Sequence, residues 1–244
     1  MNMVKFTIDG REVQAEEGKV ILEVARENHI YIPSLCYHEE VAAYGACRLC
    51  MVEITTSRGR QRLVTSCLYP VEEGLIVKTD SSRVTRVRRL VTELLLSRCP
   101  DSEVLQELAR KLGIEKPRFP LEQGNRRCIL CALCTRACQE VVGVSAISLV
   151  NRGINRQMAT PFYDFSEVCI ACGTCAEICP TNAITIEDVG DTRKVILPHV
   201  TMEFKLKICN VCGRYWAPER QLNHIIKQAN LPPDAFDKCP DCRE

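Results

Sequence analysis

Residues 128–138 read CILCALCTRAC, and residues 169–179 repeat the same cysteine spacing as CIACGTCAEIC. Three thiolates at positions i, i+3 and i+6 can bind three corners of a [4Fe–4S] cubane, and the fourth cysteine of such a run serves the other cluster. The repeat therefore predicts two cubanes that tie the halves of one domain together. The predicted ligands are Cys128, Cys131, Cys134 and Cys179 for the first cubane, and Cys169, Cys172, Cys175 and Cys138 for the second.

Four further cysteines lie in the first third of the chain. Four thiolates suit the ferric iron of a [2Fe–2S] cluster. Gly45 and Ala46 keep the loop beside Cys47 small, so that backbone N–H groups can turn towards the sulfurs. A zinc site and four buried free thiols are the alternatives, although zinc ligands more often come as two close pairs. The predicted [2Fe–2S] ligands are Cys36, Cys47, Cys50 and Cys67.

Two Cys-x-x-Cys pairs bracket the C-terminal tail, residues 201–244. This pattern predicts a closed site of four thiolates that holds a structural zinc ion. A single iron ion and a further cluster are the alternatives. Residues 218–230 are predicted to form a helix with Leu222, Ile225 and Ile226 facing inward. The predicted tail ligands are Cys209, Cys212, Cys239 and Cys242.

Composition supports metal–thiolate chemistry in a reducing compartment, because 17 of the 244 residues are cysteine and most fall into these motifs. Only Cys99 lies outside the four ligand sets; it is predicted to be a small buried apolar residue, with a redox or ligand role as the alternative. The net charge of +1 provides no overall field for nucleic acid or an anionic membrane.

The N-terminal pattern is that of a β-grasp arrangement. Alternating apolar residues, an Asp9-Gly10 turn and one helical period predict the following elements. They are strands 4–8 and 11–15, helix 20–27, and strands 51–55, 63–66 and 75–79. The whole chain is predicted to be α+β, with four parts. These parts are a [2Fe–2S] β-grasp domain (1–80), a helical connector (81–125), a two-[4Fe–4S] ferredoxin-like domain (126–200) and a zinc-ribbon-like tail (201–244).

The connector is predicted to contain helices 81–98 and 101–112, begun by Ser81 or Ser82 and by Asp101. In the first helix, one apolar stripe is expected to face the core. It consists of Val84, Val87, Leu90, Val91, Leu94 and Leu95. The arginines of this helix are interpreted as a solvated face, with a docking surface for an acidic partner as the alternative. They are Arg83, Arg86, Arg88, Arg89 and Arg98.

No motif for chemistry on a substrate is found. None of the 12 glycines forms a Gly-x-Gly, the four histidines are scattered, and no catalytic triad or carboxylate pair stands out. No catalytic residue is therefore predicted, and electron pairs from a nicotinamide would be split by a separate flavin subunit. The chain start carries charges where a signal peptide is apolar, and no run is long enough to span a bilayer. The chain is expected to be cytoplasmic, without direct membrane insertion.

Residues 44–54, YGACRLCMVEI, closely resemble the [2Fe–2S] domain of three related groups. These groups are the diaphorase small subunit of NAD-linked bidirectional hydrogenases, the N-terminal part of the large iron–sulfur subunit of complex I, and iron-only hydrogenases. Residues 127–143 resemble their cubane domain. Relatives usually hold a further [4Fe–4S] cluster with one histidine ligand between these domains, whereas residues 97–127 contain only Cys99 and no histidine.

The resemblance implies an electron-transfer subunit of a multisubunit NAD(P)-linked oxidoreductase. Its partners would be a flavin- and NAD(P)-binding subunit and a catalytic or ferredoxin-linked subunit in a hetero-oligomer, of hydrogenase, formate dehydrogenase or electron-bifurcating type. A free polyferredoxin-type carrier is the main alternative. A zinc-ribbon protein that binds nucleic acid or protein is a third, which the absence of a basic stripe on the tail disfavours.

Overall fold

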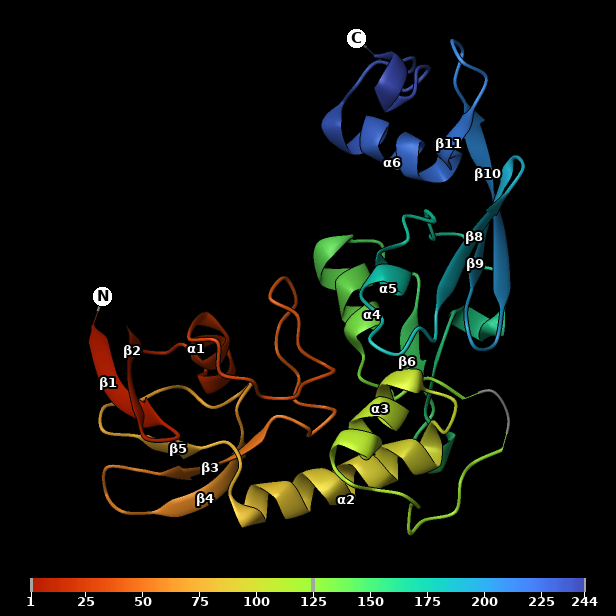
Figure 1. The fold of residues 1–244 in the computed structure, drawn as a ribbon. Coiled ribbons are helices and arrows are strands. Elements are labelled where there is room, and N and C mark those ends of the chain that lie inside the picture. Colours follow the sequence, from red (N-terminus) through yellow and green to blue (C-terminus); the bar gives the residue numbers. More distant parts are fainter. Residues whose placement is uncertain (1, 124–125, 244) are drawn as a thin grey trace. The chain divides into compact units, whose positions relative to one another are not determined.

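The computed structural model describes residues 2–123 and 126–243 of the chain. The chain forms two compact units, which consist of residues 1–131 and residues 132–244 (Figure 1). The division falls inside the first cysteine run, between Cys131 and Ala132. The predicted limits of the four parts, at residues 80, 125 and 200, stay predictions.

Unit 1 begins with the predicted β-grasp arrangement, a mixed five-stranded sheet in the order β2-β1-β5-β3-β4. Strands β1 and β5 run parallel, and the other neighbours are antiparallel. The predicted strands at 63–66 and 75–79 are slightly displaced or shortened. The elements are β1 (Met3–Ile8), β2 (Arg11–Glu16), α1 (Ile21–Glu27), β3 (Met51–Thr55), β4 (Gln61–Thr65) and β5 (Ile76–Lys78).

Alternation along the strands builds the core of this sheet. On β1, Val4, Phe6 and Ile8 are buried while the residues between them are more exposed, as a half-buried strand requires. Helix α1 covers the sheet with four fully buried side chains, Ile21, Leu22, Val24 and Ala25. The resulting core is a firm support for the cysteine loop that leaves α1 and returns to β3.

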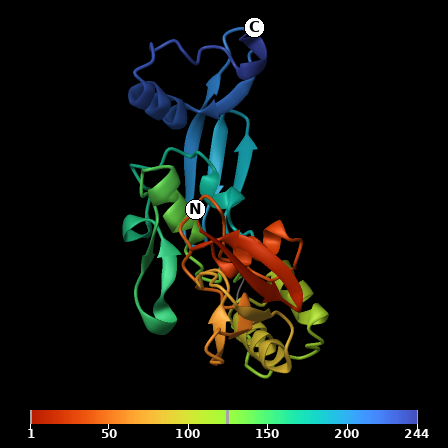
Figure 2. The same cartoon turned by 90° about the vertical axis from the view of Figure 1, so that its left-hand side faces the viewer.

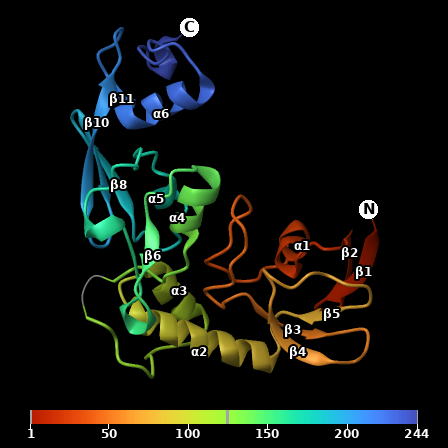
Figure 3. The ribbon, with the colours of Figure 1, turned by 180° about the vertical axis from the view of Figure 1, so that it is seen from behind.

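Helix α2 (Ser82–Arg98) begins at Ser81, whose hydroxyl accepts a hydrogen bond from the backbone N–H of Val84, and it packs against β3 and α3 (Figure 3). The predicted apolar stripe is only partly correct. Leu90 and Leu94 are exposed, and the buried positions include polar side chains. They are Val84, Arg88, Thr92, Glu93 and Leu96.

Helix α3 (Glu103–Lys111) starts two residues later than the predicted range 101–112. Ser102, not Asp101, precedes it, because the Asp101 carboxylate accepts a hydrogen bond from the backbone N–H of Arg126 instead. Gly113 follows the helix with a φ of +66°, a conformation that glycine adopts without strain. Gly113 therefore turns the chain towards the proline-containing segment that leads to the first cubane motif.

The Glu93–Arg118 pair joins α2 to this proline-containing segment. The Glu93 side chain is 8% exposed, and Arg118 Nε donates to its two oxygens at 3.1 and 2.9 Å. The hydrogen bond from Arg118 lowers the pKa of Glu93. Stabilisation by this pair is therefore present above the unfolded-state pKa of glutamate and is lost as the pH falls through the lower folded-state value.

We expect Arg118→Ala to lower the apparent melting temperature at pH 7 by about 3 °C, because a nearly buried carboxylate loses its donor. The difference from wild type should shrink as the pH falls below the ordinary pKa of glutamate and through the lower folded-state pKa of Glu93, where this carboxyl becomes protonated. Anaerobic thermal scans at pH 7 and pH 3.5 measure this difference in melting temperature. Arg110→Ala is the matched control, because Arg110 is an exposed arginine on α3. An equal difference at both pH values would contradict the role of the ion pair.

Unit 2 contains the end of the first cysteine run and the whole of the second, together with short helical turns and two small sheets. A hairpin of β6 and β7 lies between the two cysteine runs, and β8–β11 form an antiparallel sheet in the order β11-β10-β9-β8. The helical elements are α4 (Leu133–Arg136), a π-helical turn (Ala137–Val141), α5 (Thr174–Glu177) and α6 (Glu219–Ala229). The strands are β6 (Ser148–Val150), β7 (Gln157–Ala159), β8 (Thr185–Val189), β9 (Thr192–Ile196), β10 (Thr201–Ile208) and β11 (Tyr215–Pro218).

Strand β10 runs from the cluster-bearing part of unit 2 into the tail (Figure 2). Residues Thr201–Lys205 pair with β9, and Leu206–Ile208 pair with β11. Helix α6 lies within the predicted range 218–230 and packs on β10 and β11, and Leu222 is buried as predicted. The prediction for Ile225 is wrong, because 36% of its surface is exposed. A single strand thus connects the cubane motifs with the four-cysteine site.

Candidate iron–sulfur and metal centres

The first cysteine set lies in unit 1 where a loop meets the β3–β4 hairpin. Cys36, Cys47, Cys50 and Cys67 are all buried, with at most 2% of their surface exposed. The register of β3 and β4 pairs Met51 with Thr65, so Cys50 and Cys67 emerge side by side, with their sulfurs 3.3 Å apart. Cys36 and Cys47 form the second pair, in which the Cys47 N–H donates to the Cys36 sulfur at 3.3 Å.

Each pair favours one ionised sulfur. The pKa of Cys47 falls to about 6 because of its hydrogen bond with Cys36, and the pKa of Cys50 falls to about 7 because of its hydrogen bond with Cys67. The pKa values of Cys36 and Cys67 are raised, first by the same hydrogen bonds and then by burial. Buried thiolates that already receive backbone N–H groups are the donor set that a [2Fe–2S] cluster uses.

Gly45 allows this loop to close. Its φ is +68°, and a Cβ atom there would lie 2.5 Å from Leu68 Cδ1. A side chain at position 45 would be strained by the backbone conformation and would push Leu68 beside Cys67. The expected smallness of this loop therefore has a structural basis.

The second cubane motif surrounds a cavity in unit 2. Cysteines from both runs line it, namely Cys138 from the first run and Cys169, Cys172 and Cys175 from the second. Aliphatic side chains complete the wall and keep it dry. They are Val142, Val144, Ile147, Ile170, Val195, Leu197 and Met202.

The backbone around this cavity turns towards the sulfurs. Ala146 N–H donates to the Cys138 sulfur at 3.2 Å, and Ala171 and Gly173 have φ values of +55° and +90° within the Cys-x-x-Cys loops. Left-handed residues in such loops direct successive N–H groups to one point, which suits an anionic cluster. Burial, followed by the neighbouring thiols, raises the pKa of Cys175 to about 12.

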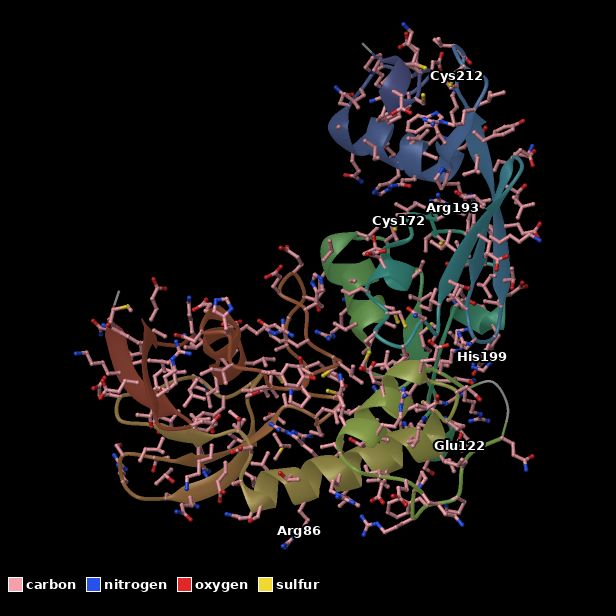
Figure 4. The ribbon with its side chains drawn as sticks, in the orientation of Figure 1. Arg86, Glu122, Cys172, Arg193, His199 and Cys212 are labelled. Atoms are coloured by element: carbon pink, nitrogen blue, oxygen red, sulfur yellow. The ribbon has the colours of Figure 1, made fainter. Side chains whose placement is uncertain are left out.

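Arg193 on β9 approaches the same loop, near Cys172 (Figure 4). Its Nη1 donates to the carbonyl of Ala171 at 3.3 Å, and the guanidinium makes a two-pronged ion pair with Asp188, with both contacts at 2.8 Å. The carboxylate of Asp188 offsets the charge of Arg193, so the contact is mainly structural.

The four cysteines predicted for the first cubane are divided between the two units in the sequence. Cys128 and Cys131 belong to unit 1, and Cys134 and Cys179 belong to unit 2. The sulfur of Cys179 accepts a hydrogen bond from Ala183 N–H at 3.2 Å, as a cluster ligand does. This ligand set stays a prediction.

Cys99 is fully buried, and its Sγ–H donates to the carbonyl of Cys128 at 3.0 Å. Burial raises the pKa of Cys99 to about 12, so it is a neutral thiol at physiological pH. The hydrogen of this thiol is already used in a bond to a backbone carbonyl, and Cys99 lies outside the repeated cysteine spacing. These observations favour the structural interpretation of Cys99.

We expect Cys99→Ala to keep the full iron and sulfide content and to lose about 1–2 kcal/mol of stability, because one carbonyl loses its donor and a small cavity forms. Metal analysis and anaerobic denaturation measure both quantities. Native Cys99 should also resist alkylation at pH 8. Loss of a cluster's worth of iron from this variant would instead assign Cys99 as a ligand.

The tail cysteines converge at the end of β10. The sulfurs of Cys209, Cys212, Cys239 and Cys242 all lie within 4.8 Å of one another, and those of Cys212 and Cys239 are 3.8 Å apart. Backbone N–H groups of Cys212 and Cys239 lower the pKa of Cys209 to about 6. Gly213, with a φ of +72°, provides the tight turn expected after the Cys209–Cys212 pair. Cys212 is labelled in Figure 4.

Two polar side chains beside the first set were not identified from the sequence. The interpretation of Arg88 as part of a solvated face is wrong, because it is buried, and Ser66 was not singled out. Both are buried, and neither belongs to a recognised ligand motif. The available signal for Arg88 was its spacing, because it lies four residues from Val84 and eight from Leu96, on the face that packs inward. The signal for Ser66 was only its place before Cys67.

Comparison with known proteins is consistent with this organisation. The family described as "2Fe-2S iron-sulfur cluster binding domain" matches residues 1–82, and the "4Fe-4S dicluster domain" family matches residues 127–183 and 168–214. The chain therefore carries a [2Fe–2S] domain followed by [4Fe–4S] dicluster sequence.

A solved crystal structure of an NAD+-reducing [NiFe]-hydrogenase in its H2-reduced state contains a similar chain. It is 31% identical with a TM-score of 0.62, and the match covers 73% of this chain and 85% of that one. The present chain belongs to the iron–sulfur subunit family of NAD-linked hydrogenases and complex I. No helix in the described part of this family member is long and apolar enough to cross a membrane.

Two sequence relatives illustrate the range of the hydrogenase and complex I family. The NADP-reducing hydrogenase subunit HndD of Solidesulfovibrio fructosivorans is 36% identical over 236 residues, covering 81% of this chain and 40% of the relative. The mitochondrial NADH-ubiquinone oxidoreductase 78 kDa subunit of Candida albicans is 31% identical over 207 residues, covering 75% and 28%. The chain thus spans less than half the length of these relatives.

Proposed function

We propose that this chain is the electron-transfer subunit of a multisubunit NAD(P)-linked oxidoreductase. It would relay single electrons between a flavoprotein subunit and a second redox site. The observation that carries the proposal is the order of the matched domains along the chain, a [2Fe–2S] domain at residues 1–82 followed by [4Fe–4S] dicluster sequence at residues 127–214. A hydrogenase chain of similar structure, 85% of which is covered by the match, supports it. The second site would belong to a hydrogenase, a formate dehydrogenase or an electron-bifurcating module.

The proposed [2Fe–2S] ligands are those of the first set, and their two-by-two pairing supports the assignment, because each of two irons takes two thiolates. For the second cubane, the shared cavity of Cys138 with the Cys169 run supports the crossed pattern. Iron–sulfur clusters accept and donate one electron at a time when bound. The cysteines that line this cavity would hold the cluster, the aliphatic side chains around it would exclude water, and backbone N–H groups such as that of Ala146 are directed to the sulfurs.

For the tail we propose one zinc ion. Four sulfurs around a single ion at about 2.3 Å lie about 3.8 Å apart, which matches the Cys212–Cys239 separation. The corners of a cubane would hold the sulfurs further apart, so the geometry favours one ion over a further cluster. Zinc is preferred to a lone iron because the site joins a small β–α unit and has no redox partner of its own in the tail.

Hetero-oligomeric association is supported by exposed apolar side chains in unit 2. Phe162 is 96% exposed and Ile154 is 79% exposed, both on the segment between the two cysteine runs. Large exposed apolar residues of this kind frequently mark contacts with a partner protein. The partners we propose are a flavin- and NAD(P)-binding subunit and a catalytic or ferredoxin-linked subunit. The cytoplasmic location stays a prediction, which cell fractionation and immunoblotting test.

Anaerobic purification followed by electron paramagnetic resonance (EPR) tests the function. Dithionite reduction should give one [2Fe–2S] signal and interacting [4Fe–4S] signals, with about ten iron atoms and one zinc atom per chain. NADH alone should leave the chain oxidised, and adding the co-purifying flavoprotein subunit should allow reduction. Colourless protein, or direct reduction by NADH, would refute the proposal.

The free polyferredoxin-type carrier makes a different prediction for native extract. A carrier would elute near the 27.5 kDa mass of the chain, whereas a subunit would elute with its flavoprotein partner. Gel filtration under anaerobic conditions, with immunodetection of the chain, separates the two functions.

A further inference from the structure

Helix α2 carries a buried cation next to the first cysteine set. Arg88 is 8% exposed, whereas Arg86, two residues earlier on the same helix, is exposed and extends outward in Figure 4. Long cationic side chains are rarely buried unless a partner compensates the cost of desolvation. The surroundings of Arg88 therefore require an explanation.

The guanidinium of Arg88 donates hydrogen bonds to the backbone carbonyls of the residues on both sides of Cys50. Its Nε donates to the carbonyl of Leu49 at 3.1 Å, and its Nη2 donates to the carbonyl of Met51 at 2.7 Å. Within the described residues, no carboxylate forms an ion pair with it. Burial lowers the pKa of Arg88, and the thiolate of Cys50 is the strongest opposing influence.

Ser66 approaches Cys50 from the opposite strand. It is fully buried, its backbone N–H donates to the carbonyl of Cys50 at 3.0 Å, and its hydroxyl has no partner in the described part of the chain. A buried hydroxyl without another acceptor, located beside a ligand sulfur, is available to donate to that sulfur.

The contrast with Arg193 shows why the missing carboxylate matters. Arg193 also donates to a carbonyl inside a cysteine loop, but Asp188 holds its guanidinium in a two-pronged ion pair. The charge at the second cubane loop is therefore offset, and the charge at the first set is not.

We propose that Arg88 and Ser66 are positioning residues that raise the reduction potential of the [2Fe–2S] centre held by Cys36, Cys47, Cys50 and Cys67. The proposal rests on the ligand set of the proposed function. Reduction adds one negative charge beside Cys50, and an uncompensated buried cation attracts that charge strongly where the dielectric constant is low. Hydrogen bonds to ligand sulfurs act in the same direction, because they too stabilise the more negative state.

This tuning would make the first centre hold its electron more firmly than the same four cysteines would alone. The connector helix then has a role beyond joining two domains, since it supplies the charge. It also explains why a residue that is costly to bury lies on the packed face of α2.

The test is an EPR-monitored redox titration of the anaerobic full-length protein and its variants. Arg88→Gln removes the charge and keeps amide donors for the two carbonyls. At the wild-type midpoint, we expect the ratio of reduced to oxidised centre to fall about tenfold, equivalent to about 59 mV for one electron. Arg88→Lys keeps the charge and should change the ratio less than about threefold. Ser66→Ala should lower it about threefold.

Arg86→Gln is the matched control, because it removes an exposed arginine from the same helix, and its midpoint should equal that of wild type. Melting temperatures of all variants show whether a shift only follows lost stability. If Arg88→Gln assembles no centre, Arg88→His replaces it, and its midpoint relative to wild type should fall as the pH rises from 5 to 8 and the imidazole loses its charge.

The outcomes test the ligand set of the [2Fe–2S] centre separately from the roles of Arg88 and Ser66. A wild-type chain without a [2Fe–2S] signal would refute the ligand set itself. A full signal with an unchanged midpoint in Arg88→Gln, or a pH-independent midpoint in Arg88→His, would refute the role of Arg88. An unchanged midpoint in Ser66→Ala would refute the role of Ser66.

Discussion

Cys138→Ala should remove the cubane held by Cys169, Cys172 and Cys175, although Cys138 belongs to the other cysteine run. The loss should be about four of about ten iron atoms, and the interaction between the cubane EPR signals should disappear. The reason is the shared cavity, in which Cys138 faces the second run among aliphatic side chains. Iron analysis and EPR of the reduced variant measure the result.

Double variants show which cysteines bind the same cubane, because two ligands of one cluster act as a unit and the iron losses of their single variants do not add. Cys138→Ala combined with Cys172→Ala should lose no more iron than either single variant. Cys138→Ala combined with Cys131→Ala should lose both cubanes and leave about two iron atoms. The opposite pattern would show that each run serves its own cluster. An intact [2Fe–2S] signal in every variant shows that unit 1 still folds.

The chemistry of the candidate sites could be read from the sequence because cysteine spacing constrains it directly. A Cys-x-x-Cys loop has few backbone paths that bring both sulfurs to one metal, so the ligand type follows from spacing. The β-grasp order was also predictable, since β1 and β2 alternate around a short turn and α1 follows with a helical period. These signals are local.

What the sequence did not reveal depends on contacts between distant segments. Leu90 and Leu94 fit the apolar period of α2, but the packed face contains Arg88, Thr92 and Glu93. A helix period indicates that one face is buried, and a polar residue can occupy that face only when distant carbonyls or cations satisfy it. Arg88 meets carbonyls 37 and 39 residues away in sequence, which no local pattern encodes.

The limit of the tail posed a similar problem. The cysteine pairs place the tail from residue 201 but do not reveal how it joins the preceding part, where β10 pairs with β9 at its start and with β11 at its end. The chain reverses between β9 and β10 without loss of pairing, because Leu197 N–H donates to the carbonyl of Val200. Strand pairing across such a turn depends on the partner strand, which a single segment does not contain.

The tail should lose both its metal and its local fold in Cys239→Ser. Cys239 is fully buried, and its N–H donates to the sulfur of Cys209 at 3.3 Å, so it is central to the site. Few other buried residues stabilise this region; Leu222 is the only buried residue of α6 within the described chain. Structural zinc contributes on the order of 10 kcal/mol in small domains, far more than this core can supply.

We therefore expect Cys239→Ser to contain less than about a tenth of the wild-type zinc. Hydrogen exchange should become fast in β11 and α6, while the iron content is unchanged. Asp241→Asn is the matched control, because Asp241 is exposed beside the same ligands and pairs with Arg214 without being a predicted ligand. Chelator treatment of wild type should reproduce the exchange pattern. If the site holds iron instead of zinc, the metal still stabilises the fold of the tail. Slow hydrogen exchange in α6 of the metal-free protein would instead show that packing on β10 alone stabilises the tail.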